Sequence, residues 1–196
     1  LSCEFLEEHV LQHPLVTKSW LSLKCMTVLL NKDSQDSKLY SLGRTGVSLR
    51  MMTSDGQWKN LSTNFDQTND FETFHNTLEA TLFDKKIYVF RKIENFSPRS
   101  TTNHFDVFDC ENETWDKLSL PEYYNSHFGI TSLNGDIYIS GGSDRYTAPL
   151  SSLFKYSVQT DTWTRMSSMN VTHQHHELVT LNGNRLCRAT IKFPRE

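Results

Sequence analysis

Three closely spaced histidines, His173, His175 and His176, are the residues in this sequence with the most evident capacity for chemistry. Imidazole nitrogens bind zinc, but zinc sites need three or four ligands at suitable spacing. If Glu177 onward is a strand, we expect His175 to lie opposite His176 across the pleat, so that only His173 and His175 share a face. Because no cysteine or carboxylate stands at a usual ligand spacing, we expect no metal site. We interpret the stretch as a loop that faces a partner.

Motifs for catalysis are not found elsewhere in the sequence. It has no Gly-x-Ser-x-Gly, no phosphate-binding loop and no His-Glu-x-x-His. Residues 53–58 resemble the Asp box of sialidases, but the spacing from Gly56 to Trp58 is too short. A copper site like that of galactose oxidase, with its linked Cys and Tyr, cannot be assembled. We therefore expect no enzymatic activity and no cofactor.

The composition narrows the class of partner. The chain has 196 residues, a net charge of −3 and a pI near 6.3, which gives no electrostatic footprint for nucleic acid or an anionic membrane. No apolar run approaches the ~18 residues of a membrane span, and no signal peptide is visible. The cysteines stand in unrelated contexts, as expected of reduced thiols in a cytoplasmic protein. They are Cys3, Cys25, Cys110 and Cys187.

The elements that position these residues are best defined in residues 127–166. An apolar strand ends at Leu133, and the chain then turns at Asn134-Gly135, a pair suited to the φ > 0 of tight hairpins. A second strand ends at Gly141-Gly142, and a polar loop follows. Four short strands separated by turn signals predict one antiparallel sheet. We expect them near residues 128–133, 137–139, 153–156 and 162–166.

This unit recurs at intervals of about fifty residues. Leu181-Asn182-Gly183 repeats Leu133-Asn134-Gly135 forty-eight positions later, and Phe83-Asp84-Lys85 precedes it by fifty. Ile87-Tyr88-Val89 corresponds in the same way to Ile137-Tyr138-Ile139. Three tryptophans keep a similar interval: Trp58, Trp115 and Trp163. A period near fifty with four strands per repeat is typical of β-propeller blades.

The unit resembles the kelch repeat, in which an apolar strand, Asn-Gly, Ile-Tyr-x-x-Gly-Gly, an aromatic residue and Trp follow one another. Ile137-Tyr138, Gly141-Gly142 and Trp163 carry the resemblance in the third unit. In the second unit Phe90-Arg91 replaces the glycine pair. The resemblance implies a mainly β fold. It would be a partial kelch β-propeller of four-stranded antiparallel blades, preceded by a short α-helical segment.

Residues 1–24 resemble the C-terminal helices of the BACK domain, which precedes the propeller in the BTB-BACK-kelch (kelch-like) family. The matching residues are Leu1-Ser2, Glu4-Phe5-Leu6, His9-Val10 and His13-Pro14-Leu15-Val16. Residues 25–196 would then be the partial propeller, and so few blades suggest a piece of a longer protein. The expected blades span about 25–61, 77–118 and 127–166, with the start of a fourth at about 176–191.

The resemblance implies a protein-binding propeller that recognises the substrate of a cullin–RING E3 ubiquitin ligase. Cullin itself would be bound only through a BTB domain, which this chain does not contain. A kelch scaffold that binds actin and the cytoskeleton is the alternative. The residues expected to bind a partner through the propeller loops are Arg91, Arg99, Tyr123, Tyr124, Arg145, Tyr146, His173 and His175. Those expected to be structural are Trp58, Trp115, Trp163, Gly141, Gly142, Tyr88 and Tyr138.

Overall fold

The computed structural model divides the chain into two compact units, residues 1–70 and 71–196, and each is described by itself. The structure describes residues 26–31, 38–43, 49–53, 55–61, 77–96, 99–122, 126–144, 148–181 and 185–189. Every element in these ranges is a β-strand, which confirms the mainly β fold. The helical segment expected in residues 1–24 lies outside the described ranges. Within them, no helix has the length and apolarity that a membrane span requires.

The first unit contains one antiparallel sheet of four strands in chain order. Its strands are β1 (Met26–Asn31), β2 (Lys38–Gly43), β3 (Leu49–Met52) and β4 (Trp58–Asn60). The turn between β3 and β4 uses Gly56, whose φ is +78°. The Thr53 hydroxyl hydrogen-bonds to the Asp55 carboxylate there and holds the pKa of Asp55 below its usual value. Among the side chains of this unit that the structure describes, the buried apolar ones are Tyr40, Leu42, Leu49, Met52 and Leu61.

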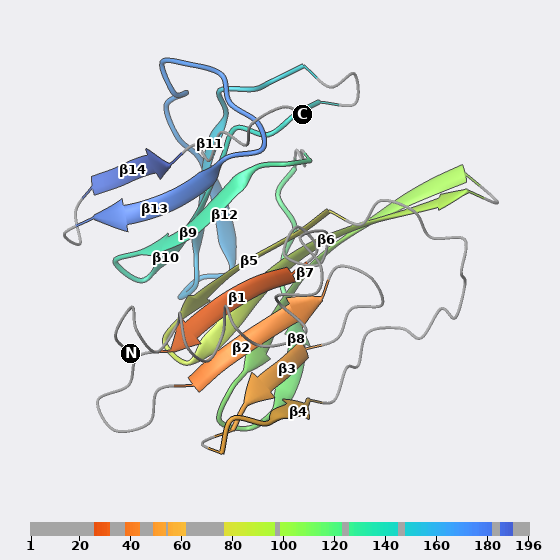
Figure 1. Cartoon of the computed structure of the whole chain (residues 1–196). Coiled ribbons are helices and arrows are strands. Elements are labelled where there is room, and N and C mark those ends of the chain that lie inside the picture. The colour runs from red at the N-terminus through yellow and green to blue at the C-terminus, as the bar shows by residue number, and fades with distance from the viewer. Residues whose placement is uncertain are drawn as a thin grey trace, which may run out of the picture. The chain divides into compact units, whose positions relative to one another are not determined.

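The second unit contains two more four-stranded antiparallel sheets and one two-stranded sheet, all in chain order (Figure 1). The first sheet has β5 (Thr77–Phe83), β6 (Lys86–Phe96), β7 (Arg99–Asp109) and β8 (Thr114–Lys117). The second has β9 (Gly129–Leu133), β10 (Asp136–Ser140), β11 (Leu153–Ser157) and β12 (Thr162–Arg165). The last has β13 (Glu177–Leu181) and β14 (Arg185–Ala189).

Two-residue turns join the first two strands of each four-stranded sheet of this unit. Asn134 and Gly135 have φ of 51° and 88°, and Asp84 and Lys85 have φ of 47° and 58°. Positive φ at both central residues defines the mirror-image turn whose twist suits a hairpin. The turn predicted at Asn134-Gly135 is confirmed, and the Asp84-Lys85 turn of the sheet β5–β8 has the same geometry without glycine.

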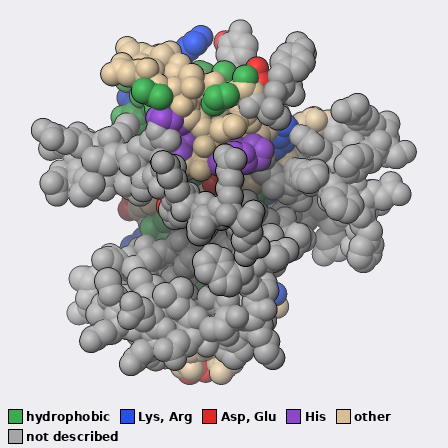
Figure 2. Space-filling view, turned by 45° about the horizontal axis from the view of Figure 1, so that its top comes forward, with side chains coloured by type: hydrophobic (Ala, Val, Ile, Leu, Met, Phe, Trp, Pro, Cys, Tyr) green, Lys and Arg blue, Asp and Glu red, His purple; other side chains and the backbone are tan. Residues whose placement is uncertain are grey.

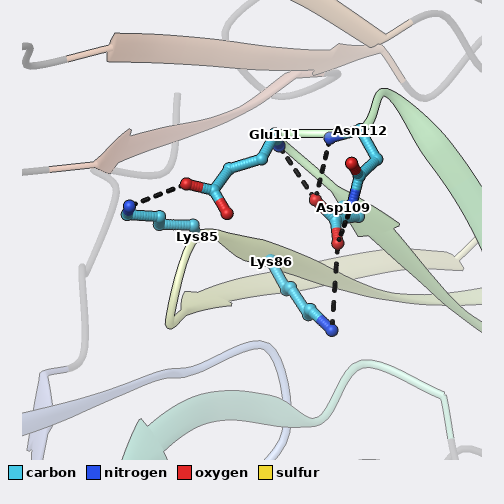
Figure 3. Close-up of polar contacts among 5 residues, drawn as sticks. All are labelled: Lys85, Lys86, Asp109, Glu111 and Asn112. Atoms are coloured by element: carbon cyan, nitrogen blue, oxygen red, sulfur yellow. Dashed lines mark hydrogen bonds and ion pairs between the residues drawn. The ribbon is translucent and has the colours of Figure 1, made fainter.

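The turn between β7 and β8 lies at the same end of the sheet as the turn between β5 and β6, and polar contacts hold it in place (Figure 3). Asp109 Oδ1 accepts hydrogen bonds from the backbone N–H groups of Glu111 and Asn112, at 2.9 and 3.1 Å. These bonds stabilise the carboxylate, so the pKa of Asp109 is lowered. Lys85 Nζ lies 2.8 Å from Glu111 Oε1 and so connects the two turns of the sheet. All of these groups are at the surface.

The strand register corrects one detail of the predicted repeat. Phe83 pairs with Lys86 and Leu133 with Asp136, so positions fifty apart correspond. Gly141 and Gly142 therefore correspond to Arg91 and Lys92, and the expected replacement by Phe90-Arg91 is wrong by one residue. The cause is that β6 continues through this point, whereas β10 ends at Ser140, so no break in the strand marks the position.

An aromatic layer fills the space between the two four-stranded sheets of the second unit. Phe90 and Phe105 stack on each other with ring centroids 4.2 Å apart. From the other sheet, Tyr156 meets Phe105 edge to face at 5.0 Å, and Trp163 lies 5.5 Å from it. Phe128 meets Phe90 edge to face at 5.3 Å. Such pairs contribute ~0.5–1.5 kcal/mol each beyond the area that they bury. The two sheets therefore pack face to face.

The first strands of the three sheets adjoin in this unit. β9 lies beside β5 on one side and β13 on the other. Ser132 Oγ donates a hydrogen bond to the carbonyl of Leu82, 3.1 Å away, from β9 to β5. Successive sheets thus repeat around a common line, and this brings the loops at one end of each sheet onto the same side.

Candidate functional site

Backbone hydrogen bonds connect the loops at one end of the second unit to one another. We call these segments, residues 126–128, 141–144, 148–152 and 169–176, the rim. Ser126 and Ser143 exchange two backbone bonds, of 3.1 and 2.7 Å. The Gly142 N–H donates to the His173 carbonyl at 2.7 Å, and the His173 N–H donates to the Leu150 carbonyl at 2.9 Å. Because each segment holds the next, the rim is one connected surface rather than a set of separate loops.

Gly141 allows the tightest approach in the rim. Its φ is +62°, and a Cβ atom placed there would lie 2.3 Å from the His173 carbonyl oxygen and 2.9 Å from the His176 ring. Both the backbone conformation and the lack of space therefore require glycine. The segment that leads to β13 crosses directly over Gly141, and this crossing leaves no room for a side chain there.

Four histidines gather around this crossing, and histidine side chains reach the surface in Figure 2. The rings of His127 and His175 have centroids 3.9 Å apart, and those of His173 and His176 lie 5.8 Å apart. His176 is buried, and its Nε2 lies 2.9 Å from Ser140 Oγ. β13 begins only at Glu177, and His175 has a φ of 51°, so the simple alternation expected for this stretch is wrong.

Polar contacts continue from the histidines to the neighbouring sheet. His127 Nδ1 lies 3.3 Å from Ser143 Oγ. Lys92 Nζ, on β6, donates to Ser126 Oγ at 2.9 Å. The rim is therefore anchored to the sheet β5–β8 as well as to its own strands.

Arg91 lies in the sheet beneath the rim rather than on its surface. Its exposed fraction is 6%, that of Asp106 is 5%, and Arg91 Nη2 lies 2.6 Å from Asp106 Oδ2. Arg91 Nε donates to the same oxygen at 3.1 Å. A buried charge is tolerated when it is paired and hydrogen-bonded in this way. The guanidinium is thus engaged inside the protein.

A second set of contacts ties the two sheets together at the end opposite the rim. Trp163 Nε1 donates to the Ser119 carbonyl at 2.7 Å. Asp161 accepts hydrogen bonds from Tyr156 Oη, at 2.7 Å, and from the backbone N–H and hydroxyl of Ser119, at 3.0 and 2.8 Å. The Tyr156 bond is the main reason that the pKa of Asp161 is lowered. Burial, followed by this bond, raises the pKa of Tyr156.

The structure places the remaining predicted residues as follows. His173 is half-buried and His175 exposed, both in the rim, whereas Arg99 begins β7. Tyr123, Tyr124, Arg145 and Tyr146 lie outside the described residues. Among the residues expected to be structural, Gly141, Gly142 and Tyr88 are buried, and burial raises the pKa of Tyr88 to about 12. Trp58, Trp115, Trp163 and Tyr138 are half-buried, and Trp115 packs on Phe108 with centroids 5.0 Å apart.

Sequence reasoning missed the rim residues that make contacts across long separations. His127 contacts His175, and Ser126 contacts Lys92, over tens of positions. The only available signal was the repeat itself, since it assigns residues before each first strand to the same end of the sheets. Within the described ranges, no three His, Cys, Asp or Glu side chains gather as a metal site would require. The rim instead presents imidazole, hydroxyl and backbone groups suited to hydrogen bonding.

Residues 125–170, which include the sheet β9–β12 and most of the rim, match the Kelch motif. The chain carries a kelch repeat. Kelch-like protein 35 of Mus musculus is 33% identical over 79 residues, which cover 40% of this chain and 13% of that protein. A RING finger domain and kelch repeat-containing protein of Dictyostelium discoideum is 25% identical over 92 residues, covering 46% of this chain and 9% of that protein. The chain thus matches only a small part of each relative.

The solved structure of YjhT extends the kelch comparison to the fold. It superposes with a TM-score of 0.62 over 80% of this chain and 55% of that one, at 15% sequence identity. At this identity the likeness concerns the fold alone. The repeated four-stranded antiparallel sheets and the kelch repeat together agree with the propeller-like fold expected from the sequence.

Proposed function

We propose that this kelch protein binds a partner protein through the rim. The observation that carries the proposal is the connected rim itself, in which four segments are hydrogen-bonded into one surface that offers His175 and the half-buried His127 and His173 to solvent. A preorganised polar surface loses little conformational entropy on binding. The proposal is for binding rather than catalysis.

We further propose that the bound protein is the substrate of a cullin–RING E3 ubiquitin ligase, in the cytoplasm. Support comes from the similarity to Kelch-like protein 35, and from a Dictyostelium relative whose name combines a RING finger domain with kelch repeats. The cullin would be engaged by another part of the full-length protein. Actin binding, the alternative implied by kelch repeats, has no specific support among the described contacts.

The test is capture of proteins by the full-length parent in three matched forms: wild type, a rim variant and a variant of the opposite end. The rim variant is His127→Ala with His175→Ala, which removes the contact between these two rings. The control is Lys85→Ala with Glu111→Ala, which removes an exposed ion pair at the far end of the sheet. A partner that is lost at least ~10-fold with the rim variant alone, and is ubiquitinated in a cullin-dependent manner, supports the proposal.

Two other outcomes would contradict the proposal. If every captured protein is retained by the rim variant, the rim is not the binding surface. If actin is recovered without cullin or ubiquitin machinery, the ligase role is wrong and the scaffold role replaces it.

A further inference from the structure

His176 is a buried histidine at the point where the segment that leads to β13 passes over the end of β10. Its exposed fraction is 6%, and its Nε2 lies 2.9 Å from the hydroxyl of Ser140, which is 2% exposed. Two glycines border its ring, because a Cβ atom at Gly129 or at Gly141 would lie 2.9 Å from a ring atom. The imidazole therefore fills a space that the neighbouring backbone leaves for it. We call the contact of residues 173–176 with Gly141 the crossing.

Backbone hydrogen bonds hold the same segment to the rest of the rim. The His173 carbonyl accepts a bond from the Gly142 N–H at 2.7 Å, and the His173 N–H donates to the Leu150 carbonyl at 2.9 Å. Two residues later, the His175 N–H donates to the His127 carbonyl at 2.9 Å. These bonds belong to the segment whose next side chain, His176, lies between the two glycines. Displacement of that ring would therefore disturb the bonds together.

Two residues at the crossing hold a backbone conformation that side chains rarely adopt. The φ of His127 is 57°, and that of His175 is 51°. Residues other than glycine are strained in this region and stay there only where the surrounding structure holds them. Their rings contact each other, with centroids 3.9 Å apart. The crossing is therefore kept closed against a local strain that opening would relieve.

Protonation would place positive charge where the crossing tolerates it least. An imidazole in water takes up a proton near pH 6.5, as a rough reference value. Burial penalises the charged form of the His176 ring. The His173 ring, with its centroid 5.8 Å away, would repel it once both carried a proton. His127 and His175 would repel each other in the same way. The closed crossing therefore favours neutral histidines.

The charged groups described on the neighbouring elements are of both signs. Lys92, on β6, brings a positive charge to the rim. The Asp144 carboxylate accepts a backbone hydrogen bond within its own turn, and Glu177, at the start of β13, is exposed. The buried Arg91 and Asp106 form an ion pair with each other. An exposed carboxylate gives little stabilisation to a nearby charge. Each proton that the rim histidines take up thus adds positive charge to the crossing.

We infer that protonation of His176 opens the crossing at mildly acidic pH and thereby releases a partner bound to the rim. The neutral ring fits between the glycines, whereas the charged ring is better solvated outside, and residues 173–176 move with it. The rim segments then no longer form one surface. Protonation of histidines biases two-state elements of this kind. This inference rests on the proposed partner binding and names the regulation of that same site.

The expected size of the effect follows from linkage. A proton that binds only to the open form, with the reference value of a free imidazole, shifts the equilibrium toward opening ~10-fold between about pH 7.5 and about pH 5.5. The closed crossing is thus fully stable above about pH 7 and is lost progressively as the pH falls below about 6.5. Further protons on the other rim histidines would increase the shift.

Amide hydrogen exchange of the full chain tests this opening at about pH 7.5 and about pH 5.5. Protection is corrected for the pH dependence of exchange itself. We expect the amides of Gly142, His173 and His175 to lose protection ~10-fold or more in acid. The control is the Cys110 amide, which donates to the Lys85 carbonyl at the opposite end of the sheet and should change less than ~2-fold. Unchanged protection in the rim, or an equal loss at Cys110, would overturn the inference.

Two glutamine variants assign the proton to its residue. His176→Gln keeps a neutral polar group that can hydrogen-bond to Ser140 but cannot titrate, so the acid effect should fall below ~2-fold. His173→Gln is the matched control, because it removes a half-buried ring of the same segment and leaves His176 in place. We expect it to keep most of the acid effect. An effect of wild-type size in His176→Gln would contradict the inference.

A measurement on the wild type needs no variant to fold. The NMR signals of the His176 ring report its protonation as the pH is lowered. We expect the ring to gain its proton with the same pH midpoint as the loss of protection at the His175 amide. A ring that becomes protonated while the His175 amide stays protected would overturn the inference.

Capture by the full-length parent at the same two pH values distinguishes this inference from the proposed function. A rim-dependent partner should be lost at least ~10-fold at about pH 5.5 from the wild type, and less than ~2-fold from His176→Gln. If the partner is retained by the wild type although the crossing opens, the inferred regulation is wrong and the rim proposal stands. If no partner depends on the rim, the proposed function fails and its regulation fails with it, whereas hydrogen exchange still decides whether the crossing opens.

Discussion

The indole nitrogen of Trp163 donates a hydrogen bond to the backbone carbonyl of Ser119, which lies forty-four positions earlier and follows the last strand of the preceding sheet. The Trp163 ring also lies 5.6 Å from Phe90 and 5.5 Å from Phe105, both in that sheet. One side chain therefore joins two consecutive sheets by packing and by a directional bond.

The two contributions of Trp163 can be separated by substitution. Trp163→Phe keeps a ring but leaves the Ser119 carbonyl without its donor, so it should lower the free energy of unfolding by ~1 kcal/mol. Trp163→Ala also removes the ring, and a loss of ~3 kcal/mol is expected because the side chain is half-buried. Urea unfolding of both variants provides the measurement. A loss below ~1 kcal/mol for the alanine variant would show that the ring does not hold the sheets together.

The turn at Asp84 and Lys85 should be open to stabilisation. Lys85 has a φ of 58°, a region that glycine enters without strain. Lys85→Gly should therefore raise the free energy of unfolding by ~0.5–1 kcal/mol, since the exposed ion pair with Glu111 contributes little. Lys85→Ala is the matched control, because it loses the ion pair and keeps the strained φ. The expected order of thermal midpoints is glycine above wild type and alanine at or below it; the reverse order would refute the assigned turn.

Gly141 and Gly135 form a second matched pair. Both have positive φ, but a Cβ at Gly135 would come no closer than 4.0 Å to Phe83, whereas at Gly141 it would collide with the His173 carbonyl. Gly135→Ala should cost ~1 kcal/mol through backbone strain alone. Gly141→Ala should cost clearly more, because the rim segment must shift. Equal losses in urea unfolding would mean that the segment at His173 does not cross Gly141 as described.

Acid should weaken the tether at Asp161. The hydrogen bonds from Tyr156 and Ser119 lower the pKa of the folded carboxyl below its unfolded value of about 3.9. The stabilisation is therefore fully present above about pH 4 and is lost as the pH falls through the folded pKa. Asp161→Asn should flatten the decline of stability between about pH 5 and pH 2, measured as the urea midpoint at each pH. An unchanged profile would show that Asp161 does not titrate with folding.

The sequence was most informative where a local pattern repeats. Asn134-Gly135 identifies a turn, and the residues that lead to Trp163 identify two strands and the turn between them. These features are local, because a positive φ and alternating burial depend on nearby residues. The length of the β6–β7 hairpin could not be foreseen, because no turn residue marks where β8 stops pairing with β7. Arg91 was expected on a loop, yet its partner Asp106 lies across the hairpin, a relationship that becomes visible only once the register is known.

The site could be predicted only in part. The repeat indicates which loops lie at the same end of successive sheets. His173 and His175 were recognised from their types, but the partner of His175 is His127, which precedes β9. Long-range contacts of this kind follow from the packing of successive sheets. These contacts cannot be inferred from the sequence of one repeat alone.

The central claim is that the sheets β5–β8 and β9–β12 pack directly on each other through their aromatic faces and thereby bring their loops onto one rim. A double-mutant cycle on Phe105 and Trp163, with Phe105→Leu, Trp163→Leu and the combined variant in urea unfolding, tests it most directly. We predict a coupling free energy of ~0.5–1.5 kcal/mol, as expected for aromatic rings in contact. Additive losses, with no coupling beyond ~0.3 kcal/mol, would contradict the packing on which the rim depends.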